Sequence, residues 1–113
     1  MDFAVTLFEL TPKGEYFQLS YIWQRASFAK DRSHRNLMTS GERTQLDFSA
    51  GILTSRQLQP GSRLVVVVSI IKQPAEQINY GTGGAVSDET AKDALLPLEI
   101  KWYGDSYIEI PTA

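Results

Sequence analysis

The chain has 113 residues, of which 42% are hydrophobic and 21% charged, and its formal net charge is −2. These values describe one small globular domain, residues 1–113, and exclude a disordered chain. The slightly acidic balance provides no overall basic field to attract nucleic acid. The absence of cysteine excludes disulfides and cysteine-based metal sites.

The longest apolar run, Leu64 to Val68, is far too short to span a bilayer. No basic leader precedes the apolar residues that follow Met1-Asp2. We therefore expect a soluble chain with neither a membrane nor a nucleic-acid partner. The sequence does not fix a location, although the lack of cysteine and of a signal peptide favours the cytoplasm.

The first half of the chain predicts a strand, a turn and a second strand. Residues 3–10 are β-branched and aromatic, and Pro12 and Gly14 mark a turn. The next segment alternates with period two. This pattern predicts a strand with one buried face, formed by Phe17, Leu19, Tyr21 and Trp23.

The middle of the chain predicts a long polar loop at residues 30–42, followed by further strands. Alternation returns at residues 43–48. After a turn at Pro60-Gly61, residues 62–72 are apolar on both faces, which predicts a central strand covered on both sides.

The last third begins with a glycine-rich loop and a short helix. Ser87 is expected to cap a helix that includes residues 88–95 and ends at Pro97. Residues 98–110 predict a hairpin with a loop of two residues (104–105) or three (104–106). The three-residue loop is preferred because it matches apolar to apolar and opposite charges to each other.

Together these elements predict five to seven short antiparallel strands, at the turn spacing of a sandwich or barrel. We therefore expect an all-β sandwich with one short helix.

The residues that could carry chemistry favour structural roles. His34 lies beside Asp31 and Ser33, but the chain has no G-x-S-x-G motif, and one histidine is too few for an ordinary zinc site. We expect His34 to be a solvated loop residue. Trp23 and Trp102 are expected in the core rather than on a sugar-stacking platform. The basic residues Lys30, Arg32 and Arg35 are expected to lie in a solvated loop.

The glycine-rich stretch resembles a phosphate loop only superficially. Gly81, Gly83 and Gly84 fit neither G-x-x-x-x-G-K-[ST] nor G-x-G-x-x-G. Asp88 and Glu89 also stand where an anion would sit. The sequence therefore predicts no catalytic, cofactor-binding or metal-ligating residue and no cofactor.

The order of motifs resembles the C-terminal domain of X-prolyl dipeptidyl-peptidase and cocaine-esterase (CocE/NonD) type serine hydrolases. The first matching segment is the strand and turn "MDFAVTLFELTPKG", through Asp2, Phe3, Val5, Leu7, Pro12 and Gly14. The second is "LQPGSRLVVVVS", through Pro60, Gly61, Arg63 and Leu64. The stretches "INYGTG" and "VSDE" are also similar to one branch of the family. Each motif alone is weak, and their order and spacing are more specific.

This resemblance implies a galactose-binding-like jelly-roll β-sandwich that packs on an α/β-hydrolase domain. In the family the nucleophile, acid and histidine belong to that other domain, so no catalytic role passes to this sequence. The family's sandwich has earlier strands, so the chain looks like the C-terminal part of one, excised or from a fragmentary reading frame. An open sheet edge would then favour a homo-oligomer.

Two other functions stay open at this point. A carbohydrate-binding β-sandwich module would need exposed aromatic side chains, whereas the alternation places Trp23 and Trp102 inside. A free-standing enzyme would need hydrolysis that depends on His34. It also stays open whether residues 77–90 face a catalytic domain in the parent protein.

Overall fold

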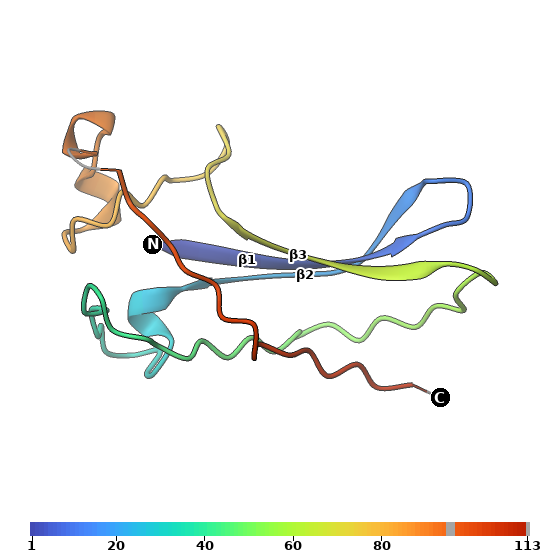
Figure 1. Ribbon diagram of the computed structural model, residues 1–113. Helices are drawn as coiled ribbons and strands as arrows, with labels where there is room; N and C mark the ends of the chain where they lie inside the picture. Colours follow the sequence, from blue (N-terminus) through green and yellow to red (C-terminus); the bar gives the residue numbers. More distant parts are fainter. Residues whose placement is uncertain (95–96, 113) are drawn as a thin grey trace.

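The computed structural model describes residues 1–94 and 97–112. Its centre is a three-stranded antiparallel sheet in the order β2-β1-β3 (Figure 1). The strands are β1 (Asp2–Leu10), β2 (Tyr16–Arg25) and β3 (Arg63–Ile70). The helical elements described are the 3-10 turns η1 (Ala26–Phe28), η2 (Val86–Asp88) and η3 (Ala91–Asp93). The expected all-β class is confirmed.

A tight hairpin joins β1 to β2 as the sequence predicts. The Thr11 N–H donates to the Glu15 carbonyl over 2.9 Å, and the Gly14 N–H donates to the Thr11 carbonyl over 2.9 Å. Gly14 has a φ of 84°, a conformation that glycine adopts without steric cost. A bulge interrupts the β1–β2 ladder between Leu7 and Phe8. The extra residue is Leu19, because Ser20 and Gln18 are the neighbouring partners.

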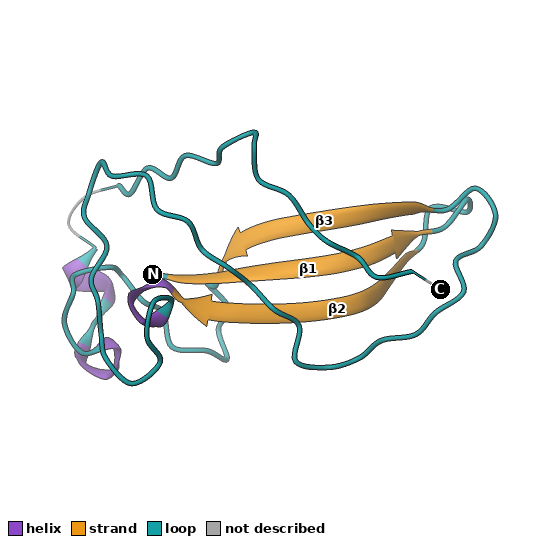
Figure 2. Ribbon diagram, turned by 90° about the horizontal axis from the view of Figure 1, so that it is seen from below, coloured by secondary structure: helices purple, strands orange, loops and turns teal. Residues whose placement is uncertain are grey.

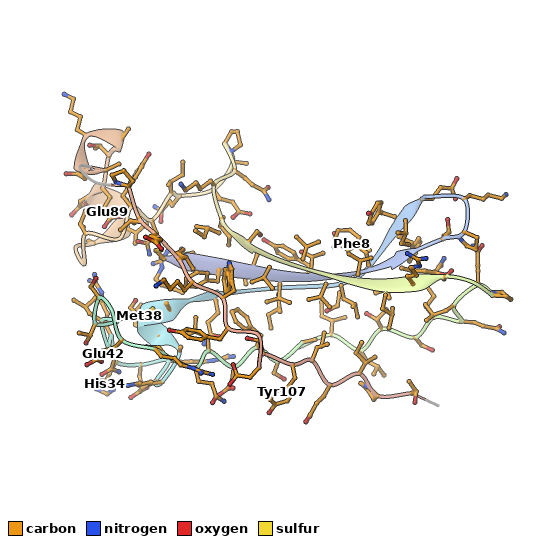
Figure 3. The ribbon with its side chains drawn as sticks, in the orientation of Figure 1. Phe8, His34, Met38, Glu42, Glu89 and Tyr107 are labelled. Atoms are coloured by element: carbon orange, nitrogen blue, oxygen red, sulfur yellow. The ribbon has the colours of Figure 1, made fainter. Side chains whose placement is uncertain are left out.

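Two long segments without ladder pairing run beneath one face of the sheet (Figures 1 and 2). They are residues 43–58 and 98–112, and we call the face above them the covered face. Phe8 projects from the opposite face, here called the outer face, whereas Tyr107 lies among the segments below (Figure 3). The molecule therefore has one formed sheet and a loose second layer.

The strands predicted in this second layer are not formed. Within residues 43–48, Thr44, Leu46 and Phe48 are partly buried and the residues between them are exposed, so the predicted alternation is right although no ladder forms. Residues 98–112 form neither of the two hairpin registers. The Ser106 N–H donates to the Tyr103 carbonyl over 3.1 Å in a single turn.

The surface area shows that the two layers do not close over a core. The accessible surface is 9150 Å², whereas a closed 12.6 kDa monomer exposes about 6,200 Å². The radius of gyration is 16.4 Å, against about 13 Å for a compact domain of this length. The apolar core is accordingly small, formed by Phe3, Ala4, Ala26 and Ile71.

The prediction that residues 62–72 form a covered central strand is wrong in position. The central strand is β1, which pairs on both sides, and β3 is an edge strand with Leu64 and Val68 about two-fifths exposed. The apolar residues on both faces of β3 suit a strand that is covered on both sides. The described part of the chain does not provide a layer on each side, so these side chains stay partly exposed.

The predicted helix at residues 88–95 is also wrong in its described part. Two separate 3-10 turns occupy the region, and Ser87 lies within η2 instead of capping it. The carboxylate of Asp93 accepts hydrogen bonds from the Thr90 N–H (2.6 Å) and hydroxyl (2.9 Å), which closes η3 into a single turn. Residue 95 lies outside the described residues.

Candidate functional site

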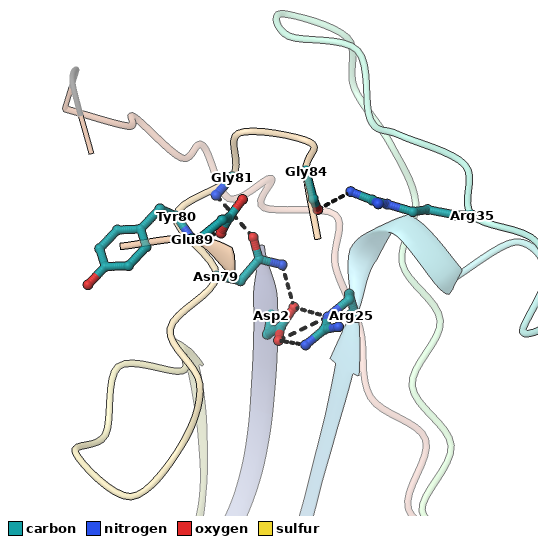
Figure 4. Close-up of polar contacts among 8 residues, drawn as sticks. All are labelled: Asp2, Arg25, Arg35, Asn79, Tyr80, Gly81, Gly84 and Glu89. Atoms are coloured by element: carbon teal, nitrogen blue, oxygen red, sulfur yellow. Dashed lines mark hydrogen bonds and ion pairs between the residues drawn. The ribbon is translucent and has the colours of Figure 1, made fainter. Parts of the chain in front are cut away.

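The glycine-rich loop, residues 77–90, lies at the start of β1 and is tied to the sheet there. The Arg25 guanidinium donates to both carboxylate oxygens of Asp2, with Nε–Oδ1 and Nη2–Oδ2 distances of 2.9 Å each (Figure 4). Asn79 Nδ2 donates to the same Asp2 Oδ1 over 2.8 Å. One buried carboxylate thus joins β1, β2 and the loop.

Glu89 organises the loop itself. Its carboxylate accepts hydrogen bonds from the Tyr80 N–H (2.7 Å) and the Thr82 N–H (3.1 Å), and from the Thr82 hydroxyl. Desolvation raises the pKa of Glu89, but the hydrogen bonds from Thr82 and Tyr80 outweigh it and hold that pKa below its usual value. These N–H groups are bonded to the protein's own carboxylate, so they do not present a phosphate cradle.

Arg35 holds the far side of the same loop. Its guanidinium donates to the carbonyl of Gly83 and to that of Gly84, the second of which Figure 4 shows. The prediction that the basic cluster lies in a solvated loop is confirmed, since Lys30, Arg32 and Arg35 are all exposed. Arg35 has in addition a structural role that the sequence did not indicate.

The group around His34 is a local turn and not a catalytic relay. His34 Nδ1 lies 2.8 Å from Asp31 Oδ2, and Ser33 donates to Asp31 Oδ1 from both its hydroxyl (2.7 Å) and its N–H (2.8 Å). These hydrogen bonds from Ser33, with that of His34, lower the pKa of Asp31 to about 2. Nucleophilic catalysis needs serine hydrogen-bonded to histidine, whereas here the serine is bonded to the acid.

A buried carboxylate that the sequence did not single out, Glu9, lies at the other end of the sheet. The side chain of Glu9 is 0% exposed. It accepts from the Gln59 N–H (2.9 Å) and the Ser62 hydroxyl (2.7 Å), and it pairs with Arg56. These three contacts, in that order, lower the pKa of Glu9 to about 2. The sequence did contain a signal for this site. Glu9 is charged, yet it continues the period-two series of apolar residues Phe3, Val5 and Leu7.

The two tryptophans are not core residues as predicted. Trp23 and Trp102 are each 55% exposed. By register Trp23 shares the outer face with Tyr21, whereas Trp102 packs edge-on against Phe3 with ring centroids 5.7 Å apart. The predicted single face of β2 is wrong, because the bulge at Leu19 splits it: Phe17 pairs with Glu9 on the covered face, whereas Tyr21 and Trp23 lie on the outer face.

The space between the covered face and the extended segments is a wide, open apolar cavity of about 2540 Å³. Ligand pockets occupy roughly 300–1,000 Å³ and enclose most of their ligand. The sheet contributes Val5, Leu7, Ile22, Leu64 and Val68 to the lining, and the extended segments contribute Leu46, Phe48 and Ile100. This combination describes a space between the sheet and the extended segments below it and not a small-molecule site.

Comparison with known proteins does not add a family: no protein-family model, curated protein or solved structure matches the chain. The part of the chain that the structure describes contains no helix long and apolar enough to cross a membrane. Among the same residues there is no group of three or more His, Asp or Glu side chains placed to hold a metal ion.

Proposed function

We propose that this chain is the non-catalytic part of a serine hydrolase of the X-prolyl dipeptidyl-peptidase and cocaine-esterase (CocE/NonD) type. In this role it packs on an α/β-hydrolase domain and contributes to a galactose-binding-like jelly-roll sandwich. It has no hydrolytic activity alone, and its parent is a peptidase or esterase.

The position of the two family-like turns carries the proposal. Both turns lie at the same end of the sheet, where β1 ends and where β2 and β3 begin. Gly14 and Gly61 have φ values of 84° and 83°, so each needs the glycine that the motif supplies. A Cβ atom on Gly61 would lie 3.4 Å from Pro12 Cγ, which places the two turns in contact.

The half-covered sheet supports the sandwich in the proposal. A β-sandwich packs two sheets about 10 Å apart, with alternate residues of each facing inward. Residues 43–48 already have this alternation toward the cavity but lack ladder partners among the described residues. Strands supplied by the remainder of a parent chain would complete that layer.

Hydrolysis assays and the neighbouring coding sequence test this proposal. The purified chain should not hydrolyse p-nitrophenyl acetate or an Xaa-Pro-p-nitroanilide above the buffer rate. An open reading frame immediately upstream should encode an α/β-hydrolase with G-x-S-x-G, and that domain should co-purify with this chain when both are expressed. Hydrolysis by the chain alone that His34→Ala abolishes would overturn the proposal.

One observation favours a carbohydrate-binding module as the second candidate. Tyr21 and Trp23 stand two positions apart on the outer face of β2, and they are 40% and 55% exposed. Exposed aromatic rings in a row can stack on sugar rings. Titration with galactose and oligosaccharides should change tryptophan fluorescence if this candidate is right. The change should vanish in Trp23→Ala and persist in Trp102→Ala.

A further inference from the structure

The outer edge of β3 is an open pairing surface. Among the described residues no strand lies beyond β3. The Ile71 N–H donates to the Asp2 carbonyl over 3.0 Å, which fixes the phase of the β1–β3 ladder. Because the direction of backbone groups alternates along a strand, the N–H and C=O groups that point away from β1 belong to the alternate residues, namely Leu64, Val66, Val68 and Ile70.

The side chains along this edge carry none of the usual features that prevent association. Residues 64–70 contain no proline and no charge, and they include four consecutive valines. Val66, Val67 and Val68 are each about two-fifths exposed. Natural edge strands are usually protected by charges, prolines, bulges or covering segments. β3 is therefore built to pair with a further strand.

The opposite edge of the sheet differs in this respect. β2 carries the bulge at Leu19, and the Thr54 hydroxyl donates to the Leu19 carbonyl over 2.7 Å. Residues 50–52 and Thr54 line a shallow groove together with residues 18–23. A covering segment and a bulge thus protect β2, and the open edge is that of β3.

The sequence of β3 is complementary to itself. A two-fold axis perpendicular to the sheet at Val67 places Leu64 opposite Ile70 and Val66 opposite Val68 of a second copy. This register uses all the outward backbone groups as hydrogen-bonded pairs. It also places Arg63 opposite Ile71, so like charges do not face each other. A closed pair with isologous symmetry removes both open edges.

We propose that β3 pairs antiparallel with β3 of a second copy of this chain, around a two-fold axis at Val67. The two sheets then form one continuous sheet of twice the width, with β2 at each end. This inference rests on the edge alone and does not depend on the proposed hydrolase function.

Charge substitutions at the axis test the proposal. Light scattering over a range of concentrations should give the mass of a dimer for the wild type. V67K and V67E should each shift the mass to that of a monomer, because the axis places each introduced charge opposite its own copy. An equimolar mixture of V67K and V67E should restore the dimer.

Val65→Lys is the matched control. It introduces the same charge on the same outer face of β3, but the proposed register places residue 65 opposite Ser69. The dimer should therefore persist in this variant, and circular dichroism should show β structure in all four proteins. A wild type that is monomeric at every concentration, or a dimer that V67K leaves intact, would overturn the proposal. So would a wild type that binds only a hydrolase domain or grows beyond a dimer.

Discussion

At the scale of single residues, carboxylates determine the local structure. Asp2 and Glu9 each accept from several donors that lie far from them in the sequence, whereas Glu89 accepts from Tyr80 and Thr82 within its own loop. Asp2 and Glu9 join β1 to other segments from buried positions, and Glu89 holds the glycine-rich loop together. Their roles are therefore architectural.

Glu9 should make the stability of the chain depend on pH in the acid range. Its pKa is about 2 in the folded protein, whereas the unperturbed value is 4.5. The group contributes its full stabilisation above pH 4.5, and that contribution is lost as the pH falls towards 2. Urea midpoints measured between pH 6 and pH 2 should fall across this window.

Glu9→Gln should have a lower urea midpoint than the wild type at pH 7 and a weaker pH dependence below pH 4.5. Asp31→Asn is the control, because Asp31 also has a pKa of about 2. Asp31 holds only a local turn on the surface, so this variant should lower the urea midpoint at pH 7 less than Glu9→Gln does. An unchanged pH profile in Glu9→Gln would show that Glu9 does not titrate as described.

Gly61 is required by the backbone conformation of the turn before β3. Its φ of 83° lies in the left-handed region, where a Cβ atom costs about 1–2 kcal/mol. Gly61→Ala should therefore lower the free energy of unfolding by about 1 kcal/mol, measured by urea denaturation. Gly51→Ala is the matched control, since a Cβ there meets no atom within 4 Å and Gly51 has no positive φ. Equal effects in the two variants would contradict this prediction.

At the scale of elements, the sequence predicts the strands and turns that depend on local residue patterns. It does not predict features that depend on contacts between distant segments. Strands β1, β2 and β3 and the turns at Gly14 and Gly61 follow directly from alternation and turn residues. The predicted buried face of β2 was wrong for Tyr21 and Trp23, because a single bulge at Leu19 puts the residues on its two sides on opposite faces and leaves no mark in the composition.

The loop at the candidate site shows the same limit. Gly81 and Gly83 are predictable as turn residues, and both have positive φ. The ties to Asp2, Arg25 and Arg35 join positions far apart along the chain, and single-sequence periodicity carries no signal for such pairs. Strands were predicted in segments 43–58 and 98–112 because their residue patterns suit a sheet. A ladder also requires a neighbouring strand to pair with, and these segments have none among the described residues.

Asp2 should be the residue that couples the sheet to the glycine-rich loop. Its side chain is 5% exposed, and it accepts from Arg25 and Asn79. Asp2→Asn should lower the free energy of unfolding by about 2 kcal/mol, since it weakens hydrogen bonds to a charged group. Amide exchange in residues 79–84 should become faster in the same variant.

The surface pair of Arg43 and Asp105 provides the control for Asp2→Asn. Its side chains are 56% and 65% exposed, so the pair is screened by solvent. Asp105→Asn should leave the urea midpoint close to that of the wild type and amide exchange in residues 79–84 unaltered. Faster exchange in Asp105→Asn, or none in Asp2→Asn, would contradict the proposed coupling.

At the scale of the whole molecule, the excess of accessible surface area links the proposed function to a property that can be measured, the binding of a dye to exposed apolar surface. The chain exposes roughly 3,000 Å² more than a closed monomer of its mass. The cavity below the covered face accounts for much of the apolar part. Pairing of β3 edges would satisfy backbone groups but leave this cavity open, so the dimer and the completed sandwich are separate events.

The open cavity should make the chain bind the dye ANS at neutral pH while its circular dichroism shows β structure. ANS fluorescence increases on apolar surface that a packed core would hide. The urea m-value should lie near or below about 1 kcal/mol/M, the low end for small proteins, because unfolding exposes little additional surface.

The dimer-disrupting variant V67K should bind ANS as strongly as the wild type, since Val67 lies on the outer face. A co-expressed α/β-hydrolase domain that completes the sandwich should reduce ANS binding and raise the m-value. Weak ANS binding by the isolated chain would show that the two layers close in solution, and it would contradict the incomplete sandwich.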